Sequence, residues 1–247
     1  MTKRAMRVPP YKAEAVERKI KGKFMEERVE RIINKPLIPM NERQAEYIQA
    51  INDYDLVIAT GFAGSSKTYI PATMAADAFI KGHIEKLYLC RPNISDSQSL
   101  GYFSGDSNEK LANWLAPIIN VLRSRMGFVA YELALKEKNI ELIPLETIKG
   151  SSFGKNTWVL VDDAEDLTIK ELKNVTTRAG GCKMILTGDT RQSVLDEKSG
   201  LAIFYDMVHR SSRLQESVWF ICFDEYSHIV RSNLCKNLII EFDKAGY

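Results

Sequence analysis

A glycine-rich loop that ends in lysine is the first feature of this sequence that could do chemistry. It follows an apolar run at 56–60 and reads Gly61-Phe62-Ala63-Gly64-Ser65-Ser66-Lys67-Thr68. Glycines let successive backbone N–H groups turn toward phosphate oxygens, and the start of the next helix adds partial positive charge. The loop therefore predicts a nucleotide site in which Lys67 reaches the β- and γ-phosphates and Thr68 binds Mg²⁺. Every loop residue and the adjoining Tyr69 are expected to contact the nucleotide.

The loop departs from the P-loop pattern GxxxxGK[ST] at one place, where Ser66 replaces the glycine before the lysine. A serine can adopt a right-handed helical conformation there without strain, and the replacement matters only if the position needs a positive φ. We therefore expect the loop to bind phosphate. A plain Gly/Ser turn with a solvated lysine is the alternative.

Two consecutive carboxylates, Asp162 and Asp163, follow a second apolar run at 158–161, in the manner of a Walker B motif. The first is expected to bind Mg²⁺ through water, and the second to polarise the water that attacks the γ-phosphate. Asp163 is one methylene shorter than the glutamate usual there, so either the water is held differently or hydrolysis is slow. Glu165 is the alternative base. Acidic pairs after strands are common, and it is the upstream P-loop that favours the metal role.

A third polar group follows the apolar run at 184–187 and reads Gly188-Asp189-Thr190-Arg191-Gln192. Ligands of open α/β sheets bind at the carboxyl ends of the strands. Gln192 is suited to sense the γ-phosphate, because its amide can donate to a phosphate oxygen while it accepts from water. A plain exposed turn is the alternative.

These groups need a scaffold of buried strands and helices. Apolar runs predict strands at 56–60, 87–90, 140–143, 158–161, 184–187 and 218–223. Helical patterns lie between them, at about 66–81, 108–138 with a break near Gly127, 168–178, 199–209 and 228–244. Near-continuous apolar strands that alternate with helices predict an α/β domain, with a mostly parallel sheet covered on both faces.

The N-terminal part differs from the rest in charge. Residues 1–36 hold 11 Lys and Arg against 5 Glu, a balance of +6, while the remaining residues carry 23 against 27. Apolar residues at mostly helical spacing predict a helix over 11–34, which cannot pass Pro36 and Pro39. We expect a basic helical arm and linker at 1–39 and an ATPase domain at 40–247. The arm is either an attraction for nucleic acid or a solvated helical face.

Other classes find little support in the sequence. No stretch approaches the ~18–20 apolar residues of a membrane helix, and the first 25 residues carry charges throughout. A cytoplasmic protein is expected. The four cysteines are too far apart for a zinc site. The segment at 34–37 lacks the aspartate of a guanine-reading NKxD motif, which argues against a GTPase.

Several motifs in one order, from about Asn41 to the C-terminus, resemble the PhoH-like family of P-loop ATPases, whose RecA-like core is related to superfamily-one helicases. They are NERQAEYIQAI, GFAGSSKT, the Arg91-Pro92 pair, LGYFSGDSNEK, LVDDAED, LTGDTRQ and HIVRSNL. Family members have DEAQ where this chain has DDAE, which leaves the rate of hydrolysis open. The short form with a helical arm looks like the version in large tailed phages.

The resemblance implies roles for further residues. Gln44 resembles the upstream glutamine that reads the adenine edge, and Gln192 the phosphate sensor. Arg231 matches a late family arginine, and an arginine can stabilise charge on the transferring phosphoryl group; a solvated helix arginine is the alternative. Arg91 and Asn93 stand where helicase cores touch the nucleic-acid backbone. Tyr102, Phe103 and Trp114 could stack on bases, although the spacing favours a core role for Trp114.

The function expected from these features is Mg²⁺-dependent ATP hydrolysis, coupled to RNA or single-stranded DNA. Two alternatives stay open: a slow-turnover, ATP-dependent nucleic-acid-binding switch, suggested by Ser66 and Asp163, and a small-molecule kinase, for which no lid signature is found. Only one RecA-like domain fits after Met40. We therefore expect a head-to-tail ring, a hexamer, in which a neighbouring copy supplies Arg231 from its last helix.

Overall fold

Apolar segments throughout the chain form one parallel sheet. The computed structural model describes residues 36–92, 107–145, 148, 153–189 and 199–246. Its six strands are all parallel and lie in the order β3-β2-β4-β5-β1-β6. They are β1 (Leu56–Gly61), β2 (Lys86–Arg91), β3 (Ile140–Pro144), β4 (Thr157–Val161), β5 (Lys183–Thr187) and β6 (Val218–Phe223). All six predicted strands are confirmed.

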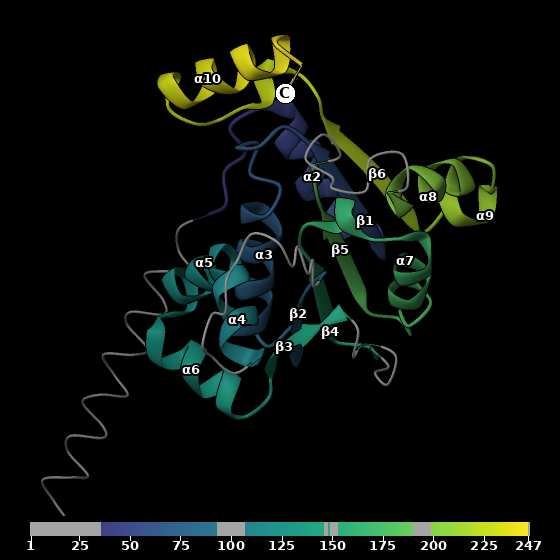
Figure 1. Ribbon diagram of the computed structural model, residues 1–247. Helices are drawn as coiled ribbons and strands as arrows, with labels where there is room; N and C mark the ends of the chain where they lie inside the picture. The colour runs from purple at the N-terminus through teal and green to yellow at the C-terminus, as the bar shows by residue number, and fades with distance from the viewer. Residues whose placement is uncertain (1–35, 93–106, 146–147, 149–152, 190–198, 247) are drawn as a thin grey trace, which may run out of the picture.

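Helices cover both faces of the sheet, and two separate hydrophobic cores result (Figure 1). One core contains Val57 and Ala59 of β1 and is closed by α2 (Glu42–Asp53), α3 (Tyr69–Ile80) and three further helices described below. The other contains Leu56 and Ile58 and is closed by α7 (Ile169–Thr176) and α8 (Gly200–His209). Because successive side chains of a strand point to opposite faces, the continuous apolar runs fill both cores.

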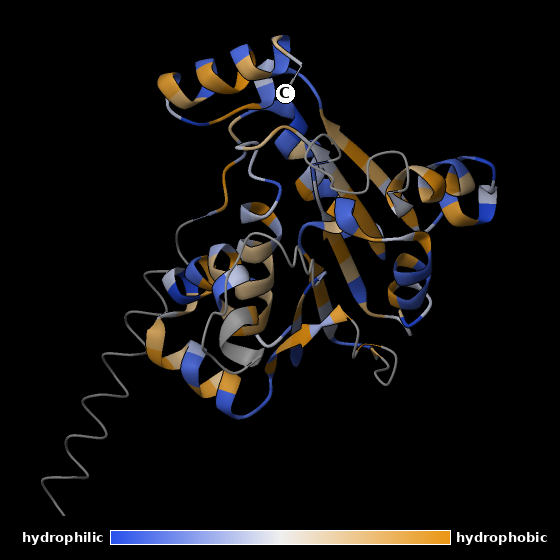
Figure 2. Cartoon of the chain, in the orientation of Figure 1, coloured by the Kyte–Doolittle hydropathy of each residue, from blue (hydrophilic) through white to orange (hydrophobic). Residues whose placement is uncertain are grey.

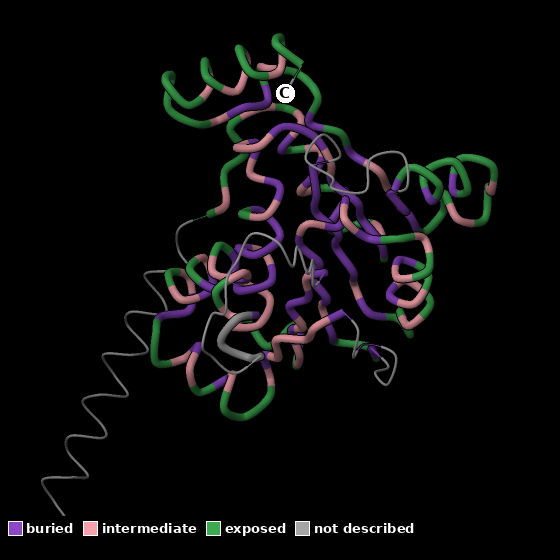
Figure 3. Tube along the Cα trace, viewed as in Figure 1, coloured by how far each residue is buried: buried purple, intermediate pink, exposed green. Residues whose placement is uncertain are grey.

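The two views coloured by hydropathy and by burial agree with this arrangement (Figures 2 and 3). The strands at the centre are largely apolar and buried, whereas the polar, exposed residues gather on the outer helices and turns. No helix in the described part of the chain is both long and apolar enough to span a membrane. The predicted arm lies outside the described residues, except for 36–39 of its linker.

The region predicted as one helix with a single break is divided into three helices. They are α4 (Ser107–Trp114), α5 (Ala116–Met126) and α6 (Phe128–Lys136). The break at Gly127 is as predicted, with φ +87°, but a second break at Leu115 was not. Pro117 in the first turn of α5 explains it, because proline disfavours helix in the preceding residues.

The C-terminal helix begins later than predicted. A short 3₁₀ turn, η4 (Tyr226–His228), is followed by irregular chain, and α10 runs over Asn233–Lys244. This helix stands away from the sheet at the upper end of Figure 1 and contains no buried residue. It presents Leu234, Leu238 and Phe242 to solvent, with exposed fractions of 71%, 50% and 59%. The four-residue helix α9 (Ser212–Gln215) lies before β6.

Three adjacent strands bring the predicted motifs together. In the sheet, β5 lies between β1 and β4, and all three end at the same edge. The P-loop follows β1, Asp162 follows β4, and Gly188 follows β5. Parallel topology therefore gathers at one edge the groups that are far apart in the sequence.

Candidate active site

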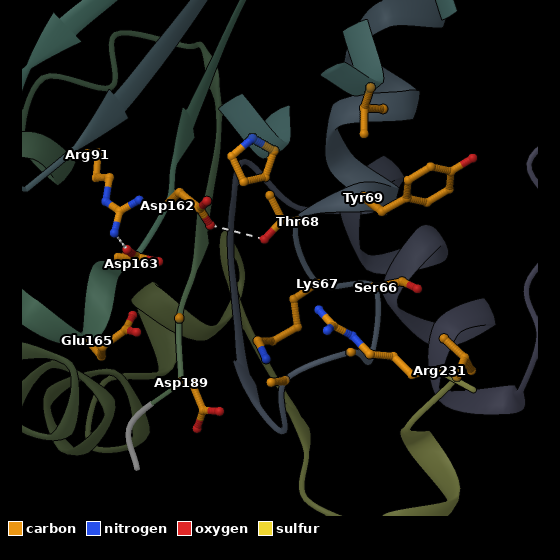
Figure 4. A pocket seen from close by; sticks show the side chains of 16 residues that line it. Ser66, Lys67, Thr68, Tyr69, Arg91, Asp162, Asp163, Glu165, Asp189 and Arg231 are labelled. Atoms are coloured by element: carbon orange, nitrogen blue, oxygen red, sulfur yellow. Dashed lines mark hydrogen bonds and ion pairs between the residues drawn. The ribbon is translucent and has the colours of Figure 1, made fainter. Parts of the chain in front are cut away.

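A cavity of about 560 Å³ opens at this edge of the sheet. Figure 4 shows Lys67 and Arg231 reaching into it from one side, and Asp162, Asp163 and Glu165 from the other. Its remaining walls come from the P-loop, the end of β2, the start of α5 and the turn after β5. The other lining residues are Ala63, Gly64, Ser66, Thr68, Tyr69, Arg91, Pro117, Val121, Gly188, Asp189 and Val230.

Lys67 is held by its own loop. Its Nζ donates to the main-chain oxygens of Gly61 and Phe62, the latter at 2.8 Å, and the residue is only 8% exposed. Its carbonyl oxygen accepts from the Tyr47 hydroxyl at 3.1 Å, which ties the loop to α2. The ammonium group is thus held at the loop, in position to exchange a carbonyl oxygen for a phosphate oxygen.

Not every loop residue faces the cavity. Gly61, Phe62 and Ser65 are buried behind it, and the Ser65 hydroxyl donates to the Phe62 carbonyl oxygen at 2.9 Å. Gly61 has φ +113°, and a Cβ there would lie 2.3 Å from the carbonyl oxygen of Phe223. Only glycine fits, because both the conformation and the contact exclude a side chain. These residues shape the loop rather than line the cavity.

Ser66 differs from the prediction. Its φ is +72°, so it occupies the left-handed region, and the expectation of a right-handed conformation is wrong. This is the position at which the P-loop pattern has glycine. The curl of the loop imposes the conformation, and a non-glycine residue that adopts it is strained by about 1–2 kcal/mol.

Gln44 is buried behind the P-loop. The residue is 2% exposed and lies outside the cavity lining. Its side-chain oxygen accepts from Met40 N at 2.8 Å, and its amide nitrogen donates to the Ser65 carbonyl oxygen at 3.1 Å. With both ends of the amide engaged, Gln44 supports the P-loop from behind. Reading of an adenine edge by Gln44 stays a prediction.

The predicted magnesium ligands lie together. The Thr68 hydroxyl donates to Asp162 Oδ1 at 3.0 Å, and the Thr187 hydroxyl donates to the same oxygen at 2.6 Å. Hydroxyl and carboxylate oxygens suit Mg²⁺, which proteins often hold with one or two such groups plus phosphates and water. Within the described ranges, no group of three or more His, Cys, Asp or Glu could bind a metal alone. The residues fit a metal that arrives with a nucleotide.

Thr187 was missed by sequence reasoning, although a signal for it existed. Val161 pairs with Leu186 in the parallel register of β4 and β5. The next residues along the two strands, Asp162 and Thr187, are therefore neighbours. A hydroxyl residue directly after MIL, beside the strand that ends at Asp162, would have indicated this support.

The second carboxylate, Asp163, forms an ion pair with Arg91 at the end of β2 (Figure 4). The other arm of the same guanidinium donates to the Trp114 carbonyl oxygen at 2.9 Å. Burial raises the pKa of Asp163 to about 6, with the Asp162 charge adding to the effect and Arg91 opposing it. Arg91 therefore lines the cavity, and its contact with a nucleic-acid backbone stays a prediction. Trp114 is half-buried.

Glu165 lies on the short 3₁₀ turn η2 (Ala164–Asp166) and is 5% exposed. Its carbonyl oxygen accepts from the Ser199 hydroxyl at 2.8 Å. Gly188 leaves room for its carboxylate, because a Cβ on that glycine would lie 2.3 Å from Glu165 Oε2. Burial raises the pKa of Glu165 to about 7, and the nearby Asp163 charge adds to the shift.

Arg231 lies in the cavity of its own chain. It precedes α10, so its predicted place on the last helix is wrong. The adjacent Val230 donates its N–H to the Gly64 carbonyl oxygen at 3.0 Å, which fixes the segment against the P-loop. The arginine therefore lines the cavity of its own chain, and its supply by a neighbouring copy stays a prediction.

Four predicted residues lie outside the described residues, namely Asn93, Tyr102, Phe103 and Gln192. Tyr69, 52% exposed, lines the cavity, and its contact with a nucleotide stays a prediction. The wall formed by Pro117 and Val121 of α5 was not predicted, since nothing local marks those residues.

A family model, the PhoH-like protein model, matches residues 36–243. This chain belongs to the PhoH-like family. The matched residues include the sequence motifs, all six strands of the described sheet and the residues that line the cavity. The fold that carries this match is an α/β fold with a parallel sheet, and its P-loop lies at the edge where β1, β4 and β5 end.

Curated relatives agree. The PhoH-like protein of Bacillus subtilis (strain 168) is 34% identical over 204 residues, which cover 81% of this chain and 62% of that protein. Protein PhoH of Escherichia coli (strain K12) is 33% identical over 209 residues, covering 83% and 57%. This PhoH-like chain thus spans about three fifths of the length of these relatives.

Two solved structures overlap with the fold in part. Pif1 helicase from Candida albicans has a TM-score of 0.39 and 13% identity, covering 76% of this chain and 40% of that one. The large terminase from a thermophilic bacteriophage has a TM-score of 0.44 and 11% identity, covering 81% and 50%.

Proposed function

We propose that this chain hydrolyses ATP in a Mg²⁺-dependent manner. The observation that carries the proposal is the convergence of Lys67, Thr68 and Asp162 on one cavity, at the start of a helix and the ends of two strands. A helix N-terminus and a lysine bind phosphate, while the hydroxyl and carboxylate pair holds the cation. When bound, Mg²⁺ neutralises charge that develops on the β- and γ-phosphate oxygens.

The remaining cavity residues have complementary tasks in this proposal. Arg231, on the P-loop side, stabilises negative charge on the transferring phosphoryl group. Thr187 fixes the carboxylate that receives the cation, as the outer hydrogen-bond partners of metal ligands do. Gln192 stays a predicted γ-phosphate sensor.

Coupling to RNA or single-stranded DNA is the finer part of the proposal. It is supported by the family resemblance and by the +6 balance of residues 1–36. Since Arg91 is engaged inside the cavity, the basic arm is the better candidate for phosphate-backbone contacts. We place the activity in the cytoplasm, where ATP and such strands are available.

The test is the rate of phosphate release from ATP, with and without single-stranded RNA or DNA, at two salt concentrations. Stimulation that is lost when residues 1–36 are deleted, together with a weaker salt dependence of binding, supports the proposal. A rate of hydrolysis that neither RNA nor DNA changes would reject the coupling and keep the assignment as an ATPase. Transfer of phosphate to a small acceptor instead of water would favour a kinase.

A slow switch is the second candidate, favoured by one observation. The ion pair with Arg91 engages the carboxylate of Asp163, which stands at the usual position of the catalytic base, and so keeps it from the reacting water. Tight Mg²⁺-ATP binding with turnover below about one per minute, and strand affinity that differs between ATP and ADP states, would favour the switch over the motor.

We also propose assembly into a ring of copies, a hexamer. The apolar face of α10, formed by Leu234, Leu238 and Phe242, supports self-association, because nothing in the described part of the chain covers it. In sedimentation experiments, Leu238→Glu should shift the chain toward monomer, while Asn237→Glu, on the same helix, should not. Wild-type chain that is monomeric at micromolar concentration with ATP would reject the ring.

A further inference from the structure

Three carboxylates follow β4 within four residues, and two of them already have a clear task. Asp162 Oδ1 accepts hydrogen bonds from two threonine hydroxyls and belongs to the candidate metal site. Asp163 is turned toward β2, where it pairs with Arg91. Neither is left to act on a water molecule beside the γ-phosphate.

The Arg91 pairing is built into the fold. Arg91 is the last residue of β2, and β2 is paired directly with β4. Its guanidinium joins Asp163 to the end of α4 through the Trp114 carbonyl oxygen. Asp163 itself has φ +52°, a left-handed conformation that aspartate adopts more readily than most residues other than glycine. The backbone is thus fixed in a conformation that directs this carboxylate to Arg91.

Glu165 lines the cavity on the same side as Asp163, outside the ion pair that Arg91 forms with Asp163. The Ser199 hydroxyl donates to the backbone carbonyl oxygen of Glu165. Its carboxylate lies against Gly188, in space that a Cβ at position 188 would fill. In Figure 4 it lies between Asp163 and Asp189 and faces the cavity across from Lys67. One methylene longer than aspartate, it compensates for the shorter Asp163.

We propose that Glu165, rather than Asp163, is the catalytic base of this chain, and that Arg91 is the positioning residue that holds Asp163 aside. The inference rests on the proposed ATPase function. A water oxygen attacks Pγ, one water proton passes to the Glu165 carboxylate, and the bond from Pγ to the β–γ bridging oxygen breaks with its electron pair left on ADP. The products are ADP and inorganic phosphate, and Glu165 then returns its proton to phosphate or solvent.

The test compares Glu165→Gln with Asp163→Asn in the full chain, with folding checked by thermal unfolding. We measure the Kd for Mg²⁺-ATP, the rate of phosphate release and the identity of the nucleotide that stays bound. Glu165→Gln should bind ATP within about threefold of wild type, lose about 100-fold or more in turnover, and retain unhydrolysed ATP. Asp163→Asn should lose less than about tenfold.

Further variants separate the remaining possibilities. Glu165→Asp, which shortens the reach, should recover part of the lost turnover. If Glu165→Gln keeps wild-type turnover while Asp163→Asn or Asp189→Asn loses it, the inference is overturned and the ATPase assignment stands. A wild-type chain that binds ATP but releases no phosphate would contradict both. If Glu165→Gln weakens ATP binding as strongly as turnover, Glu165 is a binding residue and not the base.

Discussion

The side chain of Arg231 fills the space beside Gly64 that the Cβ of any other residue would occupy. A Cβ built on Gly64 would lie 2.6 Å from Arg231 Cγ and 2.7 Å from its Nε. The P-loop and the segment before α10 therefore approach each other as closely as a glycine permits. This contact places a cation in the phosphate cavity of the same chain.

Gly64→Ala should displace Arg231 and reduce ATP turnover by about tenfold or more, because the new methyl group and the arginine compete for one space. It should also destabilise the fold by about 1–2 kcal/mol, since Gly64 has φ +80°. The matched control is Gly82→Ala, at φ +69° with nothing within 4 Å. The control should lose similar stability and no turnover. Equal turnover in the two variants would contradict a role for the contact.

Ser66→Gly should stabilise the chain by about 0.5–1 kcal/mol, because glycine adopts φ +72° without strain. Nucleotide affinity should be kept or improved, since glycine adopts the same loop conformation without strain. Lys138→Gly, at φ +58° outside the cavity, should give a similar gain in stability and no change in affinity. Denaturant unfolding and ATP titration check both. Loss of stability in Ser66→Gly would show that the serine is not strained.

Thr187→Val should raise the Mg²⁺ concentration needed for half-maximal hydrolysis by about 10-fold or more, because Asp162 loses the hydroxyl that orients it. Thr187→Ser should restore the wild-type requirement. Thr176→Val removes a hydroxyl that donates to the Leu172 carbonyl oxygen on α7 and should leave the requirement unchanged. An Mg²⁺ titration of phosphate release measures all three. A wild-type requirement in Thr187→Val would remove Thr187 from the metal site.

The stability of the nucleotide-free chain should fall as the pH rises from about 4.5 to about 7. The pKa of Glu165 is raised from 4.5 to about 7 by burial, so in this window the folded state holds a proton that the unfolded state has lost. Stabilisation by that proton is complete below the unfolded value and lost as the pH passes the folded one. Urea unfolding across the window measures it. Glu165→Gln should reduce the slope, most clearly above pH 6, where the raised pKa of Asp163 contributes less, and Glu216→Gln, at an exposed position, should not.

The sequence predicted the sheet and much of the cavity because the residues that mark them are close together in the chain. Apolar runs mark strands that are buried on both faces, and the P-loop, Asp162 and Asp163 stand directly after such strands. The left-handed conformation of Ser66 could not be predicted, since serine has no preference for it. It follows from how the loop closes against its neighbours.

Three contacts that the sequence did not predict join residues that are far apart in the chain. Gln44 meets Ser65, Arg91 meets Asp163, and Arg231 meets Gly64 only after the strands have paired and the C-terminal segment has returned to the P-loop. A motif specifies which residue types stand near a site. It does not specify which hydrogen-bond partners each side chain finds, and those partners decide what it can do.

The most direct test of the nucleotide site is the rate of phosphate release from Mg²⁺-ATP by wild type, Lys67→Ala and Lys81→Ala. Lys67 lines the cavity and donates to a P-loop carbonyl oxygen, whereas Lys81 is exposed at the far end of α3. We predict at least a 100-fold loss of rate in Lys67→Ala, with an unfolding transition like that of wild type, and no loss in Lys81→Ala. Wild-type hydrolysis by correctly folded Lys67→Ala would contradict the account.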